Sequence, residues 1–177
     1  MFDTYYHTAR SLQQKYASQI SLLVGIEIDW IRSSSKAFIE SLMARYPVDV
    51  VVGSVHHVHT IPIDFSKQMY QQALGKSGGS AELLYEAYFD AQYDMLRELK
   101  PLVVGHFDLI RLYSDFPDVS FKDFPQTWSK ILRNVAFVVD YGGIFELNSA
   151  ALRKGLTDPY PNLQICKVGF PTVPSYI

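Results

Sequence analysis

The chain contains four short apolar runs in which hydrophobic residues follow one another instead of alternating with polar ones. The clearest is VDVVVGSV (residues 48–55), which is rich in β-branched valine. A strand of this kind is buried on both faces, as in a parallel sheet covered by helices. We expect the other strands in ISLLVGIEI, PLVVGHFDL and GIFELNS (residues 20–28, 101–109 and 143–149).

Segments with helical periodicity separate these runs. The strongest is residues 80–100, where Ser80 can cap a helix, Pro101 ends it, and apolar side chains recur at helical spacing: Leu84, Tyr88, Ala91, Met95 and Leu99. Further helices are expected in residues 3–16, in 125–143, and in 33–47, where one face carries Phe38, Leu42 and Tyr46. The resulting order, α-β-α-β-α-α-β-α-β, predicts an α/β fold with about four parallel strands joined by right-handed crossovers.

Two segments fit this alternation less well. YSDFPDVSFKDF (residues 113–124) is predicted to be a surface insertion without regular structure. The last segment, residues 160–177, begins like a helix and is then broken by Gly169, Pro171 and Pro174. An α/β fold would be expected to supply another strand there, and none is readable.

Composition and charge exclude several classes of protein. The net charge is −2 and the charges are interspersed, so a nucleic-acid-binding surface is not expected. No apolar run reaches the length of a transmembrane helix, and the first residues, MFDTYYHTARSLQQKY, lack the pattern of a signal peptide. The single cysteine, Cys166, excludes an internal disulfide. We therefore expect a cytoplasmic protein that does not bind membranes.

Each predicted strand ends in side chains that can hold a metal ion. In parallel α/β proteins the carboxyl ends of the strands meet at one edge of the sheet, where ligands bind. Imidazole and carboxylate groups together suit Zn, Mn or Fe. The polar residues at the strand ends are Glu27 and Asp29, His56 and His57, His106 and Asp108, and Glu146 and Asn148.

Taken singly, these residues also have structural interpretations. Side chains alternate along a strand, so His56, His57 and His59 cannot all point into one site, and His59 is expected to be a loop residue without a catalytic role. The GHFD segment alone can be explained by a structural histidine–aspartate pair. Arg153, in ALRKG, is by default a solvated charge at the start of a helix.

Four longer segments resemble one family. LLVGIEIDW, DVVVGSVHHVHTIPIDF, LKPLVVGHFDLIRLY and YGGIFELNSAALRKGLTDPYP are similar to segments of the PHP-type histidinol-phosphatases of fungal histidine biosynthesis, in the polymerase and histidinol phosphatase superfamily. The resemblance extends from about Tyr5 to Ile165. It implies a distorted seven-stranded β/α barrel with several metal ions at the carboxyl ends of its strands. It also implies hydrolysis of a small phosphate ester, L-histidinol phosphate, to L-histidinol and phosphate.

The resemblance implies a set of metal ligands. Glu27 matches a glutamate that bridges metals, and His56 and His106 match histidine ligands in the SVH and GHFD motifs. The cofactor would be divalent metal ions, which polarise phosphate oxygens and lower the pKa of bound water to roughly 7.

The resemblance also implies residues for the substrate. Arg153 resembles the arginine that holds the substrate phosphate, through a bidentate fork that lysine cannot supply. Asn148 is expected to support substrate binding. Asp108 and His57 are the expected catalytic residues, the first as a support of the metal ligands and the second as a substrate contact.

The sequence departs from the family pattern at both ends. Family members carry H-x-H and T-E-H motifs near the N-terminus and a D-A-H-type motif near the C-terminus, and none of these is present at those positions. We therefore expect residues 1–165 to form an incomplete PHP barrel and residues 166–177 to be a divergent tail. Such a chain is expected to have weak or no activity, and its open barrel edges predict self-association.

Two other interpretations stay open. In the first, the chain is a non-catalytic PHP-domain remnant that binds a metal or a partner without turnover. In the second, its ends are gene-model artefacts and the whole protein is a complete enzyme. The proline-broken segment after NLQIC favours the second interpretation.

Overall fold

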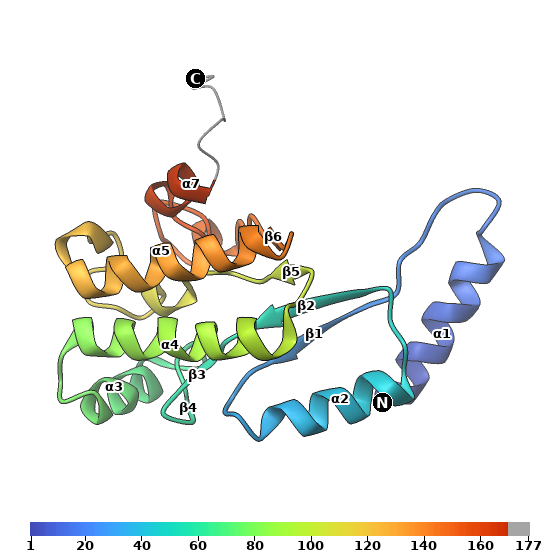
Figure 1. The fold of residues 1–177 in the computed structure, drawn as a ribbon, viewed down its shortest axis with the longest axis horizontal. Helices are drawn as coiled ribbons and strands as arrows, with labels where there is room; N and C mark the ends of the chain where they lie inside the picture. The colour runs from blue at the N-terminus through green and yellow to red at the C-terminus, as the bar shows by residue number, and fades with distance from the viewer. Residues whose placement is uncertain (170–177) are drawn as a thin grey trace.

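Four parallel strands form the central sheet in the computed structural model, which describes residues 1–169 (Figure 1). They are β1 (Gly25–Asp29), β2 (Val50–Ser54), β5 (Val103–Val104) and β6 (Ile144–Phe145), in the spatial order β1-β2-β5-β6. All three pairings are parallel. The predicted α/β fold with about four parallel strands is therefore confirmed.

Helices connect the strands in the expected order. The helices are α1 (Phe2–Lys15), α2 (Ser35–Arg45), α3 (Lys67–Lys76), α4 (Ala81–Leu99), α5 (Pro125–Asp140), α6 (Ala150–Arg153) and α7 (Leu163–Gly169). Figure 1 shows α4 and α5 side by side, and α1 at the far end of the molecule from α5 and α7. The expected helix start in NLQIC is α7, and the tail beyond it, residues 170–177, lies outside the described residues. None of the helices in residues 1–169 has the length and apolar character needed to cross a membrane.

Helix α4 follows its sequence pattern closely. Ser80 is the N-cap, and its Oγ accepts a hydrogen bond from Leu83 N at 3.3 Å. The buried face includes Leu84, Tyr88 and Met95, each fully inaccessible to solvent. A second buried contact joins α4 to α5, where Asn134 Nδ2 donates to the Phe89 carbonyl at 2.7 Å and so satisfies a buried amide.

The segment predicted to be a surface insertion is partly buried, so that prediction was wrong in part. Residues 113–124 contain a 3₁₀ helix, η2 (Phe121–Asp123), and Phe121 is fully buried. Its ring packs edge-on against Tyr85 at 5.4 Å and against Phe89 at 5.7 Å. The aromatic ring therefore anchors an otherwise irregular loop in the core.

The predicted first strand was too long, and the predicted buried face of the helix that follows it was partly wrong. The strand begins at Gly25 rather than in the apolar residues before it, and Ile20 and Leu23 are exposed. In α2 the buried residue is Ile39, whereas Phe38 is 70% exposed. An apolar run becomes a strand only where a neighbouring strand pairs with it, and β2 pairs with β1 only from Gly25 to Asp29.

A short antiparallel hairpin follows β2 and was not predicted. It consists of β3 (His57–Val58) and β4 (Ile61–Pro62), joined by His59 and Thr60. Both turn residues have positive φ, 53° and 64°, as a two-residue turn between twisted strands requires. His59 is thus a turn residue, and its Nε2 lies 2.9 Å from Ser77 Oγ.

Helix α1 has no buried residue, and side-chain contacts near the surface attach it to the fold. Tyr46 packs edge-on against Phe2 at 5.0 Å. Asp49 provides one polar attachment, since its Oδ2 accepts hydrogen bonds from Arg10 Nη1 at 2.7 Å, Gln13 Nε2 at 2.9 Å and Val24 N at 2.8 Å. A second is the hydrogen bond from Tyr5 Oη to the Gly25 carbonyl at 2.6 Å. One carboxylate oxygen therefore ties α1 to the segment that leads into β1.

We predict that Asp49→Asn loosens α1 while leaving the core folded, since the other hydrogen bonds of α1 remain. The amide loses the negative charge that Arg10 contacts, so the backbone amides of α1 should exchange with deuterium faster than in the wild-type chain. Hydrogen exchange followed by mass spectrometry measures this. Asp94→Asn, an exposed change on α4, is the matched control, and equal exchange of α1 in both variants would contradict the prediction.

The same attachment should depend on pH. The Val24 N–H, followed by Arg10 and Gln13, lowers the pKa of Asp49 from 3.8 to about 2. Because the folded-state pKa is below the ordinary value, the stabilisation is present above about pH 4 and is lost as the pH falls towards 2. Exchange of α1 should accelerate over this interval, after correction for the intrinsic rate.

Candidate metal centre

Three of the predicted site residues lie together at one end of the sheet. Glu27 lies in the middle of β1, His56 follows β2 by two residues, and His106 follows β5 by two residues. One ligand atom from each residue lies within 4.8 Å of those of the other two. His106 Nε2 is 3.1 Å from Glu27 Oε1, and His56 Nε2 is 3.9 Å from the same oxygen.

The donor set fits a divalent metal ion. Two imidazole nitrogens and a carboxylate oxygen form the mixed set that Zn, Mn and Fe accept in proteins. Both Nε2 atoms face the same carboxylate oxygen, and the two rings are 4.7 Å apart between centroids. The structure therefore brings Glu27, His56 and His106 into an arrangement that can hold an ion.

The carboxylate of Glu27 is kept ionised. The hydrogen bond from His106 lowers its pKa from 4.5 to about 2, against the opposing effect of burial, and Ser54 adds to the lowering. The Ser54 hydroxyl is buried and donates to Glu27 Oε1 at 2.6 Å. An ionised carboxylate is the form that binds a metal.

Asp29, at the end of β1, lies close to Nδ1 of both His56 and His57. Its Oδ1 is 3.3 Å from His56 Nδ1, and its Oδ2 is 2.9 Å from His57 Nδ1. Burial acts to raise the pKa of Asp29, but the hydrogen bond and charge of His56, together with His57, hold it below its usual value. The sequence placed Asp29 at the strand end without assigning it a role.

His106 is held by its backbone as well as by its ring. Glu146, just after β6, accepts a hydrogen bond from His106 N at 2.8 Å. The φ angle of His106 is 22°, a strained value for a residue with a side chain. A Cβ on the preceding Gly105 would lie 2.5 Å from Ser54 Oγ, so a side chain there would displace the hydroxyl that donates to Glu27. The sequence placed Glu146 at a strand end and gave it no role, and the structure shows it in contact with His106.

Asp108, which was predicted to be catalytic, is fully buried. Its Oδ2 lies 2.7 Å from Arg111 Nε and accepts a hydrogen bond from Asn162 N at 3.0 Å. Arg111 in turn donates to the carbonyl of Pro159 at 2.7 Å. This pair holds the loop before α7 against η1 (Leu109–Arg111). A catalytic role for Asp108 stays a prediction that these contacts do not support.

The two predicted substrate residues lie at opposite ends of a short segment. Asn148 forms a backbone bridge with Tyr160, and its Oδ1 accepts from Ala150 N at 2.9 Å, at the start of α6. Arg153 ends α6, is exposed, and lies 3.4 Å from Ser149 Oγ. The structure thus places Arg153 at the surface and Asn148 as the residue that fixes the start of its helix.

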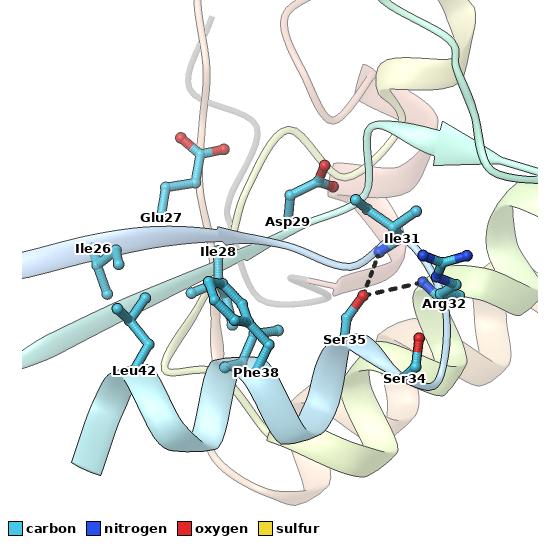
Figure 2. Close-up of a pocket in the computed structure, with 11 residues that line it drawn as sticks. Ile26, Glu27, Ile28, Asp29, Ile31, Arg32, Ser34, Ser35, Phe38 and Leu42 are labelled. Carbon is cyan, nitrogen blue, oxygen red and sulfur yellow. Dashed lines mark hydrogen bonds between the residues drawn. The ribbon is translucent and has the colours of Figure 1, made fainter. Parts of the chain in front are cut away.

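The two faces of β1 have different characters. Figure 2 shows Glu27 and Asp29 pointing away from α2, and Ile26, Phe38 and Leu42 in the space between β1 and α2. That space is an open, mostly apolar groove of about 400 Å³. The carboxylates of Glu27 and Asp29 therefore lie on the face of β1 opposite to the groove.

We predict that acid destabilises the wild-type chain more than it destabilises Glu27→Gln. The folded-state pKa of Glu27 is about 2, below its ordinary 4.5. The ionised carboxylate therefore stabilises the folded chain above pH 4.5, and this stabilisation is lost as the pH falls towards 2. The glutamine variant has no such group to titrate. Urea unfolding at several pH values, in metal-free buffer, measures the difference; parallel pH profiles for the two chains would contradict the prediction.

Comparison with known proteins agrees with this geometry. The PHP domain family matches residues 1–150. A Schizosaccharomyces pombe protein assigned as a histidinol-phosphatase is 46% identical over 169 residues, which cover 94% of this chain and 55% of that protein. The histidinol-phosphatase of Saccharomyces cerevisiae is 31% identical over 193 residues, covering 94% of this chain and 58% of the yeast protein.

A solved structure shows the same fold. The crystal structure of a Listeria monocytogenes protein assigned as a histidinol phosphatase superimposes with a TM-score of 0.79 at 24% identity, covering 96% of this chain and 66% of that one. The chain spans about half the length of the curated relatives it matches. Because the family match extends over residues 1–150 and the fold agrees, the chain belongs to the PHP domain family.

Proposed function

We propose that this chain is part of a histidinol-phosphatase, which hydrolyses L-histidinol phosphate to L-histidinol and phosphate in histidine biosynthesis. The observation that carries the proposal is the convergence of Glu27, His56 and His106 from three strands of a PHP domain. The names of the relatives from the two yeasts support the same substrate. The working location is proposed to be the cytoplasm.

In this proposal Glu27, His56 and His106 hold a divalent ion, for which Zn, Mn and Fe are the candidates. A bound ion would activate water for attack near neutral pH and would polarise the phosphoryl oxygens. Glu27 contributes a full negative charge, because His106 and Ser54 stabilise its ionised form.

Other residues are proposed to act on the substrate. The exposed guanidinium of Arg153 would hold the phosphate through two parallel hydrogen bonds. Asn148 would act indirectly, since its hydrogen bond to Ala150 N fixes the helix that carries Arg153. His57 would contact the substrate next to His56. Asp108 would support His106 from the interior, because its ion pair with Arg111 fixes the turn that follows.

We further propose that residues 1–165 form part of a barrel and that the chain alone turns over slowly. A non-catalytic protein that binds a metal or a partner is the second candidate. The observation that favours it is that Asp108, a predicted catalytic residue, is fully buried and paired with Arg111. Metal binding without phosphate release would distinguish this candidate from the enzyme.

We predict that His106→Ala lowers the affinity for Zn²⁺ or Mn²⁺ by at least about tenfold, since one of three ligands is lost. Competition with a chromogenic chelator measures the affinity, and phosphate release from L-histidinol phosphate measures turnover. His7→Ala, which changes an exposed histidine on α1, is the control. Equal losses in both variants would contradict the assignment of the site, and metal binding without turnover would support the second candidate.

Self-association through the open sheet edges is also proposed. Strands β1 and β6 are the outer strands of the sheet. Beside β1, Phe38 is 70% exposed, and just after β6, Leu147 is 71% exposed. Exposed apolar side chains next to unpaired strand edges favour pairing with another chain.

We expect the mean mass of the wild-type chain to rise with concentration, and Phe38→Ser to reduce this rise by removing apolar surface beside β1. Sedimentation velocity over a range of concentrations measures the effect. Phe116→Ser is the matched control, because Phe116 is 71% exposed on a loop outside the sheet. A concentration-independent monomer would contradict the proposal.

A further inference from the structure

We propose that Asp29 is a positioning residue that orients the His56 and His57 rings together. The inference rests on the proposed metal-dependent function and deepens it by naming what fixes one of the metal-binding imidazoles. Neither the resemblance to the family nor the strand-end pattern assigns a role to this residue.

A single carboxylate reaches both rings. Asp29 Oδ1 lies 3.3 Å from His56 Nδ1 and also accepts a hydrogen bond from the His56 backbone N at 3.2 Å. Asp29 Oδ2 lies 2.9 Å from His57 Nδ1. The two oxygens are thus divided between two consecutive histidines. The strand register makes this possible, because Asp29 pairs with Ser54, two residues before His56.

The contact at His56 decides which ring nitrogen is available to a metal. A carboxylate accepts hydrogen bonds, so a neutral ring beside it places its proton on Nδ1. The lone pair is then on Nε2, the atom that lies 3.9 Å from Glu27 Oε1. A histidine whose second nitrogen is held by a carboxylate is the usual arrangement for a metal ligand. Without Asp29 the ring could turn about its last torsion, which has a broad profile.

His106 is positioned by a different device. Its ring contacts Glu27, and its backbone N–H is held by Glu146. Asp29 makes its contacts on the His56 and His57 side only. Loss of Asp29 should therefore disturb those two rings and leave His106 in place. This selectivity separates positioning from a general loss of structure.

The test compares Asp29→Ala and Asp29→Asn with the exposed control Asp94→Asn in the full chain. Long-range ¹H–¹⁵N spectra of the imidazole rings, recorded without metal in alkaline buffer, report which nitrogen carries the proton. Chelator competition with Zn²⁺ reports the affinity. In the wild-type chain His56 should carry its proton on Nδ1. In Asp29→Ala the proton should move towards Nε2, and the Zn²⁺ affinity should fall by about 10- to 100-fold.

Asp29→Asn keeps the shape and one acceptor oxygen, so one of the two rings should keep its Nδ1 proton and the loss of affinity should be smaller. His106 should keep its own tautomer in both variants, because its contacts to Glu27 and Glu146 do not involve Asp29. Unchanged His56 signals and unchanged Zn²⁺ affinity in Asp29→Ala would overturn the proposal. If Asp29→Ala fails to fold, the asparagine variant decides by the same two measurements. A wild-type chain that binds no Zn²⁺ would contradict the proposed function, and the metal-free spectra would still decide the role of Asp29.

Discussion

The parallel register between β1 and β2 determines the geometry of the candidate metal centre. It places Glu27 beside Val52 and Asp29 beside Ser54, so both carboxylates extend from the same face of the edge strand. Ser54 then reaches Glu27, and His56 follows two residues later in reach of Asp29. A slip of one residue would turn both carboxylates towards the apolar groove beside α2. The buried isoleucines of β1 and α2, Ile28 and Ile39, therefore stabilise a chemical arrangement as well as a core.

Much of the architecture could be predicted because local and global preferences agree. The continuous valine run of β2 and the capped, periodic α4 each indicate a structure that the rest of the fold accepts. The β3–β4 hairpin was missed because His59 and Thr60 occupy backbone conformations that normally indicate glycine or asparagine. Phe121 was missed because its burial depends on aromatic partners on α4, which no local pattern reveals.

The candidate site, like the fold, could be predicted only in part. His56 and His106 could be predicted, since residues that follow parallel strands meet at one edge of the sheet, and Glu27 was predicted with them although it lies in the middle of β1. The contacts of Asp29 and Glu146 could not be predicted, because they depend on which atoms face one another at about three ångströms. Asp108 also follows a strand, yet its side chain is buried in the interior. There it forms an ion pair with Arg111 and accepts a hydrogen bond from the backbone N–H of Asn162. Position at a strand end therefore does not by itself place a side chain in this site.

The close approach of Gly105 to Ser54 limits which residues evolution can place at either position. Ser54 Oγ occupies the space that a side chain at Gly105 would need, and the same hydroxyl bonds Glu27. A larger residue at position 105 would displace the hydroxyl, and loss of the hydroxyl at position 54 would remove the hydrogen bond to Glu27. Neither position can change by itself without altering the carboxylate. We expect the two positions to have been inherited as a unit, so that drift at either one is suppressed wherever the metal centre is under selection.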